Sequence, residues 1–323
     1  MRFTDKLAAN GVLILDGALA TELEKRGCNL NHSLWSAAIL DQHPDLISDV
    51  HRAYLEAGAD CITTASYQAS IPGFRAAGFT HNQSETLYRQ SIRLAYAARN
   101  SFCQERGIAS DSLDAPLVAI SIGPYGAFLA DGSEYRGHYQ VSEKELSHFH
   151  EDRIALAVDE LQQHTDQPLL AFETIPSLPE ALTLLKKLAL HPSTKAWLSF
   201  SCATRSETCE RQAISDCMPE LDFSNQLVAI GINCTEPKLL GELIPQFAVS
   251  NRPVIAYPNA GDIYDPISKE WQKGDVLSNT AHTFDQWASA GATVLGGCCG
   301  SSPEWISELA AWRNKRRQSG SHI

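Results

Sequence analysis

The chain has 323 residues, 44% of them hydrophobic and 20% charged, and its formal net charge at pH 7 is −12. Enough apolar residues are present for a large core, which excludes a globally disordered protein. The negative charge and the lack of a basic stripe argue against a protein that binds nucleic acid.

The sequence shows neither the pattern of a membrane-spanning segment nor that of a secretory signal. No apolar run approaches the roughly 18 residues that span a bilayer, and the first residues, MRFTDKLAANG, lack the apolar stretch of a secretory signal. We interpret the basic cluster near the other end as a solvated helix end; it contains Arg313, Lys315, Arg316 and Arg317. We therefore expect a cytoplasmic protein that acts on small molecules, and the sequence leaves its oligomeric state open.

Short apolar runs alternate with longer amphipathic stretches along the whole chain. Each run is mostly apolar, as expected of parallel strands buried on both faces. The predicted strands are Val12–Asp16, Cys61–Ala65, Leu117–Ile122, Leu169–Glu173, Ala196–Ser201, Leu227–Asn233, Pro253–Pro258 and Ala292–Gly297.

Helical patterns lie between these runs. The predicted helices include Asp45–Ala57, Ser84–Glu105, Ser142–Gln163, Leu178–Leu190, Asn279–Ala290 and Pro303–Arg313. Ser142 and Glu145 fit a capping box, and Ser302-Pro303 places proline at a first helical position.

Eight strand–helix repeats in one chain predict a (β/α)₈ barrel, taken here as a single domain over residues 1–323. The alternative is a doubly wound open sheet, but no G-x-G-x-x-G motif follows the first strand. Two long connections, Gly123–Gln140 and Asn259–Ser278, follow the carboxyl ends of strands, where barrel active sites form.

Three cysteines at predicted strand ends stand out among the nine in the chain. Adjacent Cys298 and Cys299 make a poor disulfide, because the bond would strain the peptide between them. Gly296, Gly297 and Gly300 would let the backbone turn so that both sulfurs reach one ion. Cys234, which follows the sixth predicted strand, would supply a third sulfur ligand to the same ion.

Three thiolates with an open fourth position are typical of a catalytic zinc site, since a structural site fills all four. Soft sulfur ligands favour zinc over magnesium or calcium. The alternative is that these cysteines are small residues that only pack the barrel end. Their common position at strand ends favours the metal site, with Cys234, Cys298 and Cys299 acting in catalysis through the metal.

Two carboxylates also end predicted strands. Asp16, followed by Gly17, and Glu173 could hold the cationic amine of a free amino acid by charge-assisted hydrogen bonds. The alternatives are an Asp-Gly turn at Asp16 and a helix cap or salt bridge at Glu173. Asn233 is a candidate for orienting a ligand or supporting Cys234.

Tyrosines in strand-end loops form a third group of candidates. Their rings could line a pocket for a sulfonium or ammonium methyl donor through cation–π attraction, although ordinary packing would also explain them. They are Tyr67, Tyr125, Tyr135, Tyr139, Tyr257 and Tyr264.

Together these segments resemble the homocysteine S-methyltransferase family over nearly the whole chain. The matching segments are Asp16-Gly17-Ala18-Leu19-Ala20-Thr21-Glu22-Leu23, Phe172-Glu173-Thr174, Gly231-Ile232-Asn233-Cys234 and Gly297-Cys298-Cys299. The resemblance implies a barrel, zinc held by the three cysteines, and homocysteine held by Asp16 and Glu173.

Further segments resemble the short family members that use S-methylmethionine as methyl donor. They are Gly123-Pro124-Tyr125-Gly126, Leu129-Ala130-Asp131-Gly132-Ser133-Glu134-Tyr135-Arg136-Gly137 and Ser66-Tyr67-Gln68-Ala69. Tyr67 is accordingly counted with Asp16, Gly17, Glu173 and Asn233 as a substrate-binding residue. Two features depart from the family pattern: the region Cys202–Phe223, and Gly300, where a basic or polar residue is expected.

Other readings of the site stay open on the sequence alone. The donor could instead be S-adenosylmethionine or betaine, or the acceptor selenocysteine. A zinc-binding or thiol redox sensor with Cys298 and Cys299 as a reversible pair is the non-enzymatic alternative. The Asp16 and Glu173 pair favours an enzyme, because a sensor would not need it.

Overall fold

The computed structural model describes residues 3–30, 38–165, 167–261, 263–265, 270–272 and 280–319. Most of the predicted connection Asn259–Ser278, the first residue of the predicted helix Asn279–Ala290 and the side chain of Tyr264 lie outside the described residues.

Eight parallel strands form the central sheet, and each lies within or close to a predicted run. Their order in the sheet is β1-β10-β7-β6-β5-β4-β3-β2. The strands are β1 (Leu13–Ile14), β2 (Cys61–Thr63), β3 (Leu117–Ile122), β4 (Leu169–Ile175), β5 (Lys195–Phe200), β6 (Leu227–Asn233), β7 (Val254–Tyr257) and β10 (Ala292–Leu295). A separate antiparallel pair is formed by β8 (Ile263–Asp265) and β9 (Glu270–Gln272).

The first and second strands in the chain meet and close the sheet into a barrel. A parallel bridge joins Leu15 to Cys61. Backbone hydrogen bonds run from Asp60 N to Ile14 O at 2.7 Å and from Asp16 N to Cys61 O at 3.0 Å. The predicted (β/α)₈ barrel is therefore confirmed and the open sheet is excluded, since β1 pairs on both sides.

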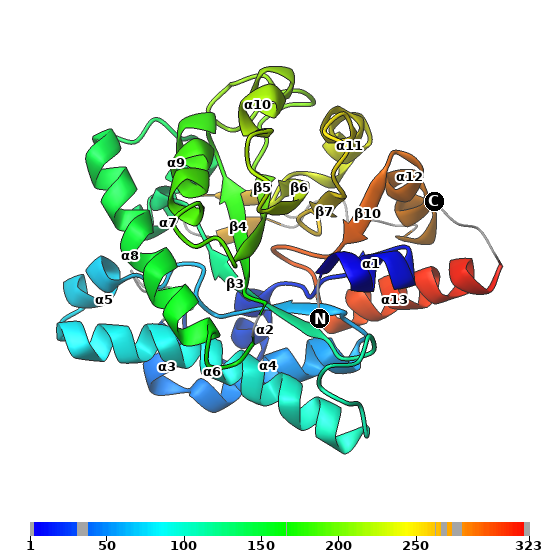
Figure 1. The fold of residues 1–323 in the computed structure, drawn as a ribbon, viewed down its shortest axis with the longest axis horizontal. Helices are drawn as coiled ribbons and strands as arrows, with labels where there is room; N and C mark the ends of the chain where they lie inside the picture. The colour runs from blue at the N-terminus through cyan, green and yellow to red at the C-terminus, as the bar shows by residue number, and fades with distance from the viewer. Residues whose placement is uncertain are drawn as a thin grey trace.

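The helices surround the strands in chain order, so that α13 lies beside α1 and near α4 where the ring closes (Figure 1). They are α1 (Phe3–Asn10), α2 (Leu19–Lys25), α3 (Ile39–Gln42), α4 (Pro44–Glu56), α5 (Ile71–Ala76), α6 (His81–Glu105), α7 (Tyr125–Leu129), α8 (Glu143–Leu161), α9 (Leu178–Leu188), α10 (Ile214–Leu221), α11 (Leu240–Ala248), α12 (Thr280–Ser289) and α13 (Pro303–Gln318), with 3₁₀ turns η2 (Ser133–Tyr135) and η3 (Pro237–Leu239). The capping box at Ser142 and the Ser302-Pro303 start are both present.

Alternate residues of each strand bury into two different cores. Inside the barrel, Leu13, Ala171, Trp197, Ile255 and Val294 belong to one buried cluster, together with Phe3 of α1. The larger cluster lies between the strands and the surrounding helices. Because both faces are covered, the strands are almost continuously apolar, and polar residues are confined to their ends.

A buried charge network lies at the amino end of the barrel. Asp60, just before β2, forms an ion pair with Arg313 of α13 and accepts a 2.8 Å hydrogen bond from Ile14 N. Lys6 of α1 lies 3.9 Å from the same carboxylate. The prediction that the basic cluster is a solvated helix end is thus wrong for Arg313, which is only 7% exposed. Helical spacing turns Arg313 inward, whereas Lys315 and Arg317 are exposed.

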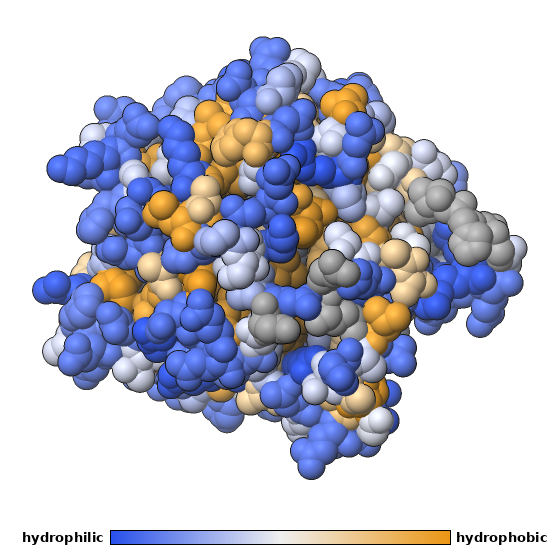
Figure 2. Space-filling view, in the orientation of Figure 1, coloured by the Kyte–Doolittle hydropathy of each residue, from blue (hydrophilic) through white to orange (hydrophobic). Residues whose placement is uncertain are grey.

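The outer surface is mostly polar. Figure 2 shows that hydrophilic side chains cover most of the face drawn, with hydrophobic side chains between them in small groups. In the part of the chain that the structure describes, no helix has the length and apolar character needed to cross a membrane.

We predict that Arg313→Met lowers the free energy of unfolding by about 3 kcal/mol, because Lys6, which is more distant, would then be the nearest cation to the buried Asp60 carboxylate. Urea unfolding measures the change. The exposed Arg317→Met serves as control and should change the value by less than about 0.5 kcal/mol. Equal values for the two variants would contradict a stabilising role for the network.

Candidate active site at the carboxyl ends of the strands

The three cysteines singled out in the sequence lie together at the carboxyl ends of β6 and β10. Their sulfur atoms are all within 4.8 Å of one another, and Cys234 Sγ lies 3.6 Å from Cys299 Sγ. Cys234 is buried, whereas Cys298 and Cys299 are half-buried. This set of three soft donors fits a zinc ion in both chemistry and spacing.

The backbone departs from strand geometry at the cysteines that follow β6 and β10. Cys234 follows β6 with φ 49°, and its N–H donates to Tyr257 O at 3.2 Å. After β10, Cys298 N donates to Pro258 O at 2.8 Å, and Gly300 has φ 80°. Of the three glycines predicted to permit this turn, Gly300 alone has a positive φ, which explains why no larger residue stands there.

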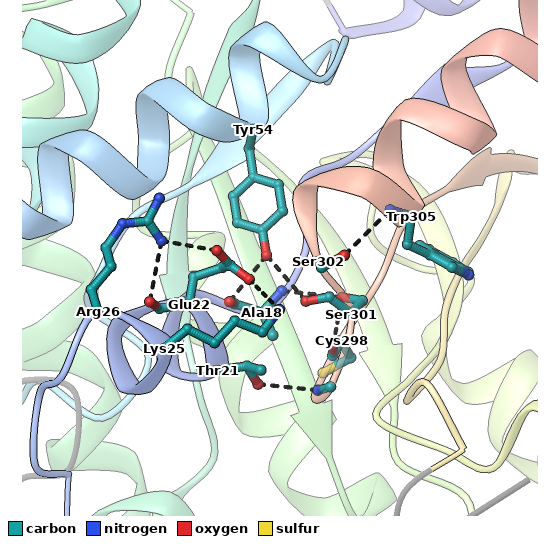
Figure 3. A network of polar contacts seen from close by, with 11 residues as sticks. Ala18, Thr21, Glu22, Lys25, Arg26, Tyr54, Cys298, Ser301, Ser302 and Trp305 are labelled. Atoms are coloured by element: carbon teal, nitrogen blue, oxygen red, sulfur yellow. Dashed lines mark hydrogen bonds and ion pairs between the residues drawn. The ribbon is translucent and has the colours of Figure 1, made fainter. Parts of the chain in front are cut away.

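Hydrogen bonds tie the Cys298–Ser301 turn to the loop after β1, and Figure 3 shows this network. Ser301 Oγ donates to Cys298 O at 2.6 Å and accepts from Ala18 N at 3.2 Å. Tyr54 Oη of α4 lies 3.0 Å from Ala18 O and 3.2 Å from Ser301 O. Residues almost a whole chain apart are thus held side by side, and both ends of the chain build the site.

Close packing explains the glycine after Asp16. A Cβ atom at Gly17 would lie 2.7 Å from Ser301 Oγ and 2.9 Å from the Tyr54 ring. Gly17 therefore lets the β1 loop approach the cysteine turn, and it lines the cavity described below.

Asp16 lies two residues after β1 and points toward the end of β2. Its carboxylate accepts hydrogen bonds from Thr63 N at 2.7 Å and from Thr63 Oγ1 at 3.2 Å. Burial raises the pKa of Asp16 well above its usual range, although the Thr63 N–H opposes this shift, and the negative charge of Glu173 adds to it.

Glu173 lies near the end of β4 and is also buried. Ser121 Oγ and Tyr257 Oη donate to its two oxygens, the second at 3.0 Å. Burial raises the pKa of Glu173 to about 7, the charge of Cys298 adds to this, and the two hydroxyl donors oppose it. Asp16 and Glu173 are therefore held by an amide and hydroxyls rather than by lysine or arginine, so a cationic ligand would stabilise both carboxylates.

Asn233 connects the two sides of the site. Its Oδ1 accepts from Thr174 N at 2.6 Å, its Nδ2 donates to Thr174 Oγ1 at 2.8 Å, and the same nitrogen lies 4.0 Å from Cys298 Sγ. Thr174 has φ 60°, so Asn233 holds the residue after Glu173 in a left-handed conformation. The side chain thus fits a supporting role more directly than a ligand contact.

A cavity of about 420 Å³ lies over the three sulfurs. Its walls include every residue proposed from the sequence as a metal or substrate ligand: Asp16, Gly17, Tyr67, Glu173, Asn233, Cys234, Cys298 and Cys299. Its size is ordinary for a small-molecule site.

Three of the six candidate tyrosines line this cavity. Tyr67 and Tyr257 are among its walls, and Tyr135 Oη lies 3.0 Å from Cys234 Sγ. Tyr125 and Tyr139 pack against each other instead, with ring centroids 5.6 Å apart. The sixth, Tyr264, lies outside the side chains described.

The long connection after β3 and the region 202–223, which departs from the family pattern, contact each other beside the cavity. The connection 123–140 folds into α7 and η2, and the region 202–223 forms two antiparallel bridges followed by α10. Glu210 Oε1 of the second region accepts from His138 N of the first at 2.6 Å. Ser201 Oγ donates to Glu134 O at 2.9 Å. The cysteines of this region are not part of the sulfur cluster, and Cys202 and Cys217 are buried in the larger core instead.

The thiols influence each other's ionisation. Hydrogen bonds from Cys234 and Cys299 hold the pKa of Cys298 well below its usual range, and the interaction with Cys298 raises the pKa of Cys234. One thiolate is thus favoured before any ion arrives, which prepares the cluster for a cation.

Sequence reasoning missed residues that hold the ligand candidates in place. Thr63, Ser121 and Ser301 are single hydroxyl residues without a motif, and only the fold brings them to the site. Glu134 was not singled out either, although it precedes Tyr135 in one of the family-like segments of the loop after β3.

The fold and the cavity define a barrel enzyme with a sulfur cluster at its mouth. The family model of homocysteine S-methyltransferase matches residues 13–312. A Bacillus subtilis homocysteine S-methyltransferase, YbgG, is 42% identical over 304 residues, which cover 93% of this chain and 94% of that protein. An Escherichia coli homocysteine S-methyltransferase is 41% identical over 302 residues, with 93% and 94% covered.

A solved structure agrees with these similarities. The metallated form of the homocysteine methyltransferase MmuM from Escherichia coli matches with a TM-score of 0.82 and 38% identity, covering 94% of this chain and 97% of that chain. The chain therefore belongs to the homocysteine S-methyltransferase family and is an enzyme of the methyltransferase class. The family predicted from the strand-end segments is confirmed.

We predict that Ser301→Ala lowers the free energy of unfolding by about 1–3 kcal/mol, because it removes the acceptor of Ala18 N and one of the two donors to Cys298 O. Urea unfolding measures this. Ser101→Ala, which removes an exposed 3.0 Å hydrogen bond to Glu105, is the matched control and should cost less than about 0.5 kcal/mol. If both variants unfold alike, the turn does not depend on Ser301.

Proposed function

We propose that the protein transfers a methyl group from S-methylmethionine to the thiol of L-homocysteine and so yields two molecules of methionine. The observation that carries the proposal is the sulfur cluster and the two buried carboxylates on the walls of one cavity. The family similarity supports homocysteine as acceptor. The choice of donor rests on the resemblance of the loop after β3.

The metal proposed for this reaction is zinc. Cys234, Cys298 and Cys299 would hold it, and when bound it would lower the pKa of the homocysteine thiol so that a thiolate is available at neutral pH. A free thiol has a pKa of about 8.5, so little of it is ionised without such help.

The protein's own residues bind and orient the acceptor. Asp16 and Glu173 would receive its α-ammonium group, which supplies the cation that both buried carboxylates lack. Asn233 holds Thr174 near the end of β4 and directs one N–H toward Cys298. The acceptor sulfur would then face the open side of the cavity.

Methyl transfer needs no general acid. The homocysteine thiolate supplies the electron pair of the new bond to the methyl carbon. The electron pair of the broken bond between the methyl carbon and the donor sulfur returns to that sulfur, and the donor leaves as a neutral thioether. The thiol proton is released when the thiolate forms. Most of the rate gain beyond thiolate formation would come from aligning the two sulfurs about the methyl carbon, with Tyr67 and Tyr135 lining the path of the cationic donor.

The cavity of about 420 Å³ has room for two amino-acid-sized molecules, homocysteine and a donor. We expect S-methylmethionine to give the highest kcat/KM among S-methylmethionine, S-adenosylmethionine and betaine. Purified protein assayed for methionine with each donor tests this, and a preference for betaine or S-adenosylmethionine would overturn the choice of donor.

We predict that Cys234→Ser reduces bound zinc from about one to less than about 0.2 ions per chain and lowers kcat/KM at least 100-fold, because loss of a ligand should cost more than the roughly 10–100-fold of outer-shell changes. Metal analysis and the methyl-transfer assay are the measurements. Cys209→Ser, a buried cysteine outside the cluster, is the control and should keep its zinc. Full activity in zinc-free Cys234→Ser would end the metal proposal.

We predict that binding of the product methionine strengthens about tenfold from pH 6 to pH 8. Glu173, with a pKa of about 7, is protonated at the lower pH and charged at the higher, where it attracts the ammonium group. Calorimetric titration measures the affinity. Glu173→Gln should reduce the dependence on pH.

A ligand without the ammonium group, 4-(methylthio)butanoate, controls for other titrating groups and should show no gain in affinity with pH. An equal gain for both ligands, or an unchanged pH profile in Glu173→Gln, would contradict the assignment of Glu173.

A further inference from the structure

Glu134 carries a carboxylate that no residue of the described chain satisfies fully. It lies in η2, lines the cavity, and its Oε2 is buried without a hydrogen-bond partner among the described residues. The nearest cation along the chain, Arg136, faces Asp131 instead, at 3.7 Å. Leaving a buried carboxylate oxygen unpaired is costly, so this position points to a ligand.

The backbone of Glu134 is held firmly. Its carbonyl accepts from Ser201 Oγ at 2.9 Å, just after β5. The preceding residue, Ser133, donates its N–H to Asp131 Oδ1 at 2.9 Å. The side chain therefore reaches the cavity from a fixed loop that covers the strand ends, whereas Asp16 and Glu173 reach it from the strands themselves.

Glu134 also lies near the sulfur cluster. The next residue, Tyr135, places its hydroxyl 3.0 Å from Cys234 Sγ. The negative charge of Glu134 contributes to raising the pKa values of Tyr67 and Tyr135, after burial as the main cause, so both rings lie within its electrostatic reach. Burial raises the pKa of Glu134 itself to about 7; the charge of Asp131 adds to this shift, and the charge of Arg136 opposes it.

The unpaired oxygen restricts the chemistry of the ligand. An acceptor oxygen needs an N–H or O–H donor, and a sulfonium or quaternary ammonium centre has none. An α-ammonium group supplies both a positive charge and N–H donors.

We propose that Glu134 binds the α-ammonium group of the methyl donor, and that it thereby selects donors that are amino acids. This inference rests on the proposed function. The cavity would then hold two ammonium groups in separate places: that of homocysteine at Asp16 and Glu173, and that of the donor at Glu134. Betaine, which carries no N–H, would gain nothing from this contact. Glu134 is a positioning and specificity residue rather than one that takes part in bond making.

The test compares Glu134→Gln with the native protein on two donors: S-methylmethionine and its desamino analogue, a 4-(dimethylsulfonio)butanoate. Both carry the same methyl sulfonium, and only the first has an α-ammonium group. We expect Glu134→Gln to lower kcat/KM about 10- to 100-fold with S-methylmethionine, through KM for the donor, and less than about twofold with the analogue. KM for homocysteine and bound zinc should stay within about twofold of the native values.

Two further variants sharpen the result. Glu134→Asp keeps the charge and should recover part of the loss. Glu220→Gln, an exposed glutamate of α10, makes the same change in net charge and should leave both donors unaffected. An equal loss with both donors, or a loss confined to KM for homocysteine, would overturn the proposal. Failure of the proposed function itself would appear already in the native protein, as an absence of methyl transfer from S-methylmethionine.

Discussion

The site depends on the pairing of β1 with β10, the first and last strands of the barrel in the chain. Gly297 N donates to Asp16 O at 3.0 Å, and Leu15 N donates to Leu295 O at 2.7 Å, so the β1 loop and the cysteine turn are parts of one hydrogen-bonded surface. Without this pairing, Asp16 and the pair Cys298–Cys299 would have no common cavity. Cys234 completes the cluster because β6 lies next to β7, which lies next to β10.

The cluster and the carboxylates both favour positive charge, but of different kinds, and one reaction would supply both. Three thiolates favour a soft cation, and buried Asp16 and Glu173 favour an ammonium group. Burial is the main cause that raises the pKa of both carboxyl groups; the charge of Glu173 adds to the shift of Asp16, and the charge of Cys298 adds to that of Glu173. An acceptor amino acid together with a metal would relieve the repulsion between these charges, so the site is built to be filled by cations.

Much of the fold and of the candidate site could be predicted from the sequence. The apolar runs predicted all eight strands, because strands that are buried on both faces have a clear sequence pattern. The positions of Asp16, Glu173, Cys234 and Cys298 at the ends of these strands then predicted that they lie in one site. The burial of Arg313 could not be predicted from its neighbours in the sequence, because its partner Asp60 lies far away in the chain. Glu134 gave no signal either: a glutamate in a polar loop looks solvated until neighbouring loops bury it.

The central claim is that three protein sulfurs hold zinc and leave one position for the sulfur of homocysteine. X-ray absorption at the zinc edge, on zinc-loaded protein with and without homocysteine, tests it most directly. The account predicts that the number of sulfur neighbours at about 2.3 Å rises from three to four when homocysteine is added. A sulfur count that does not change on adding homocysteine, or that is below three beforehand, would contradict it.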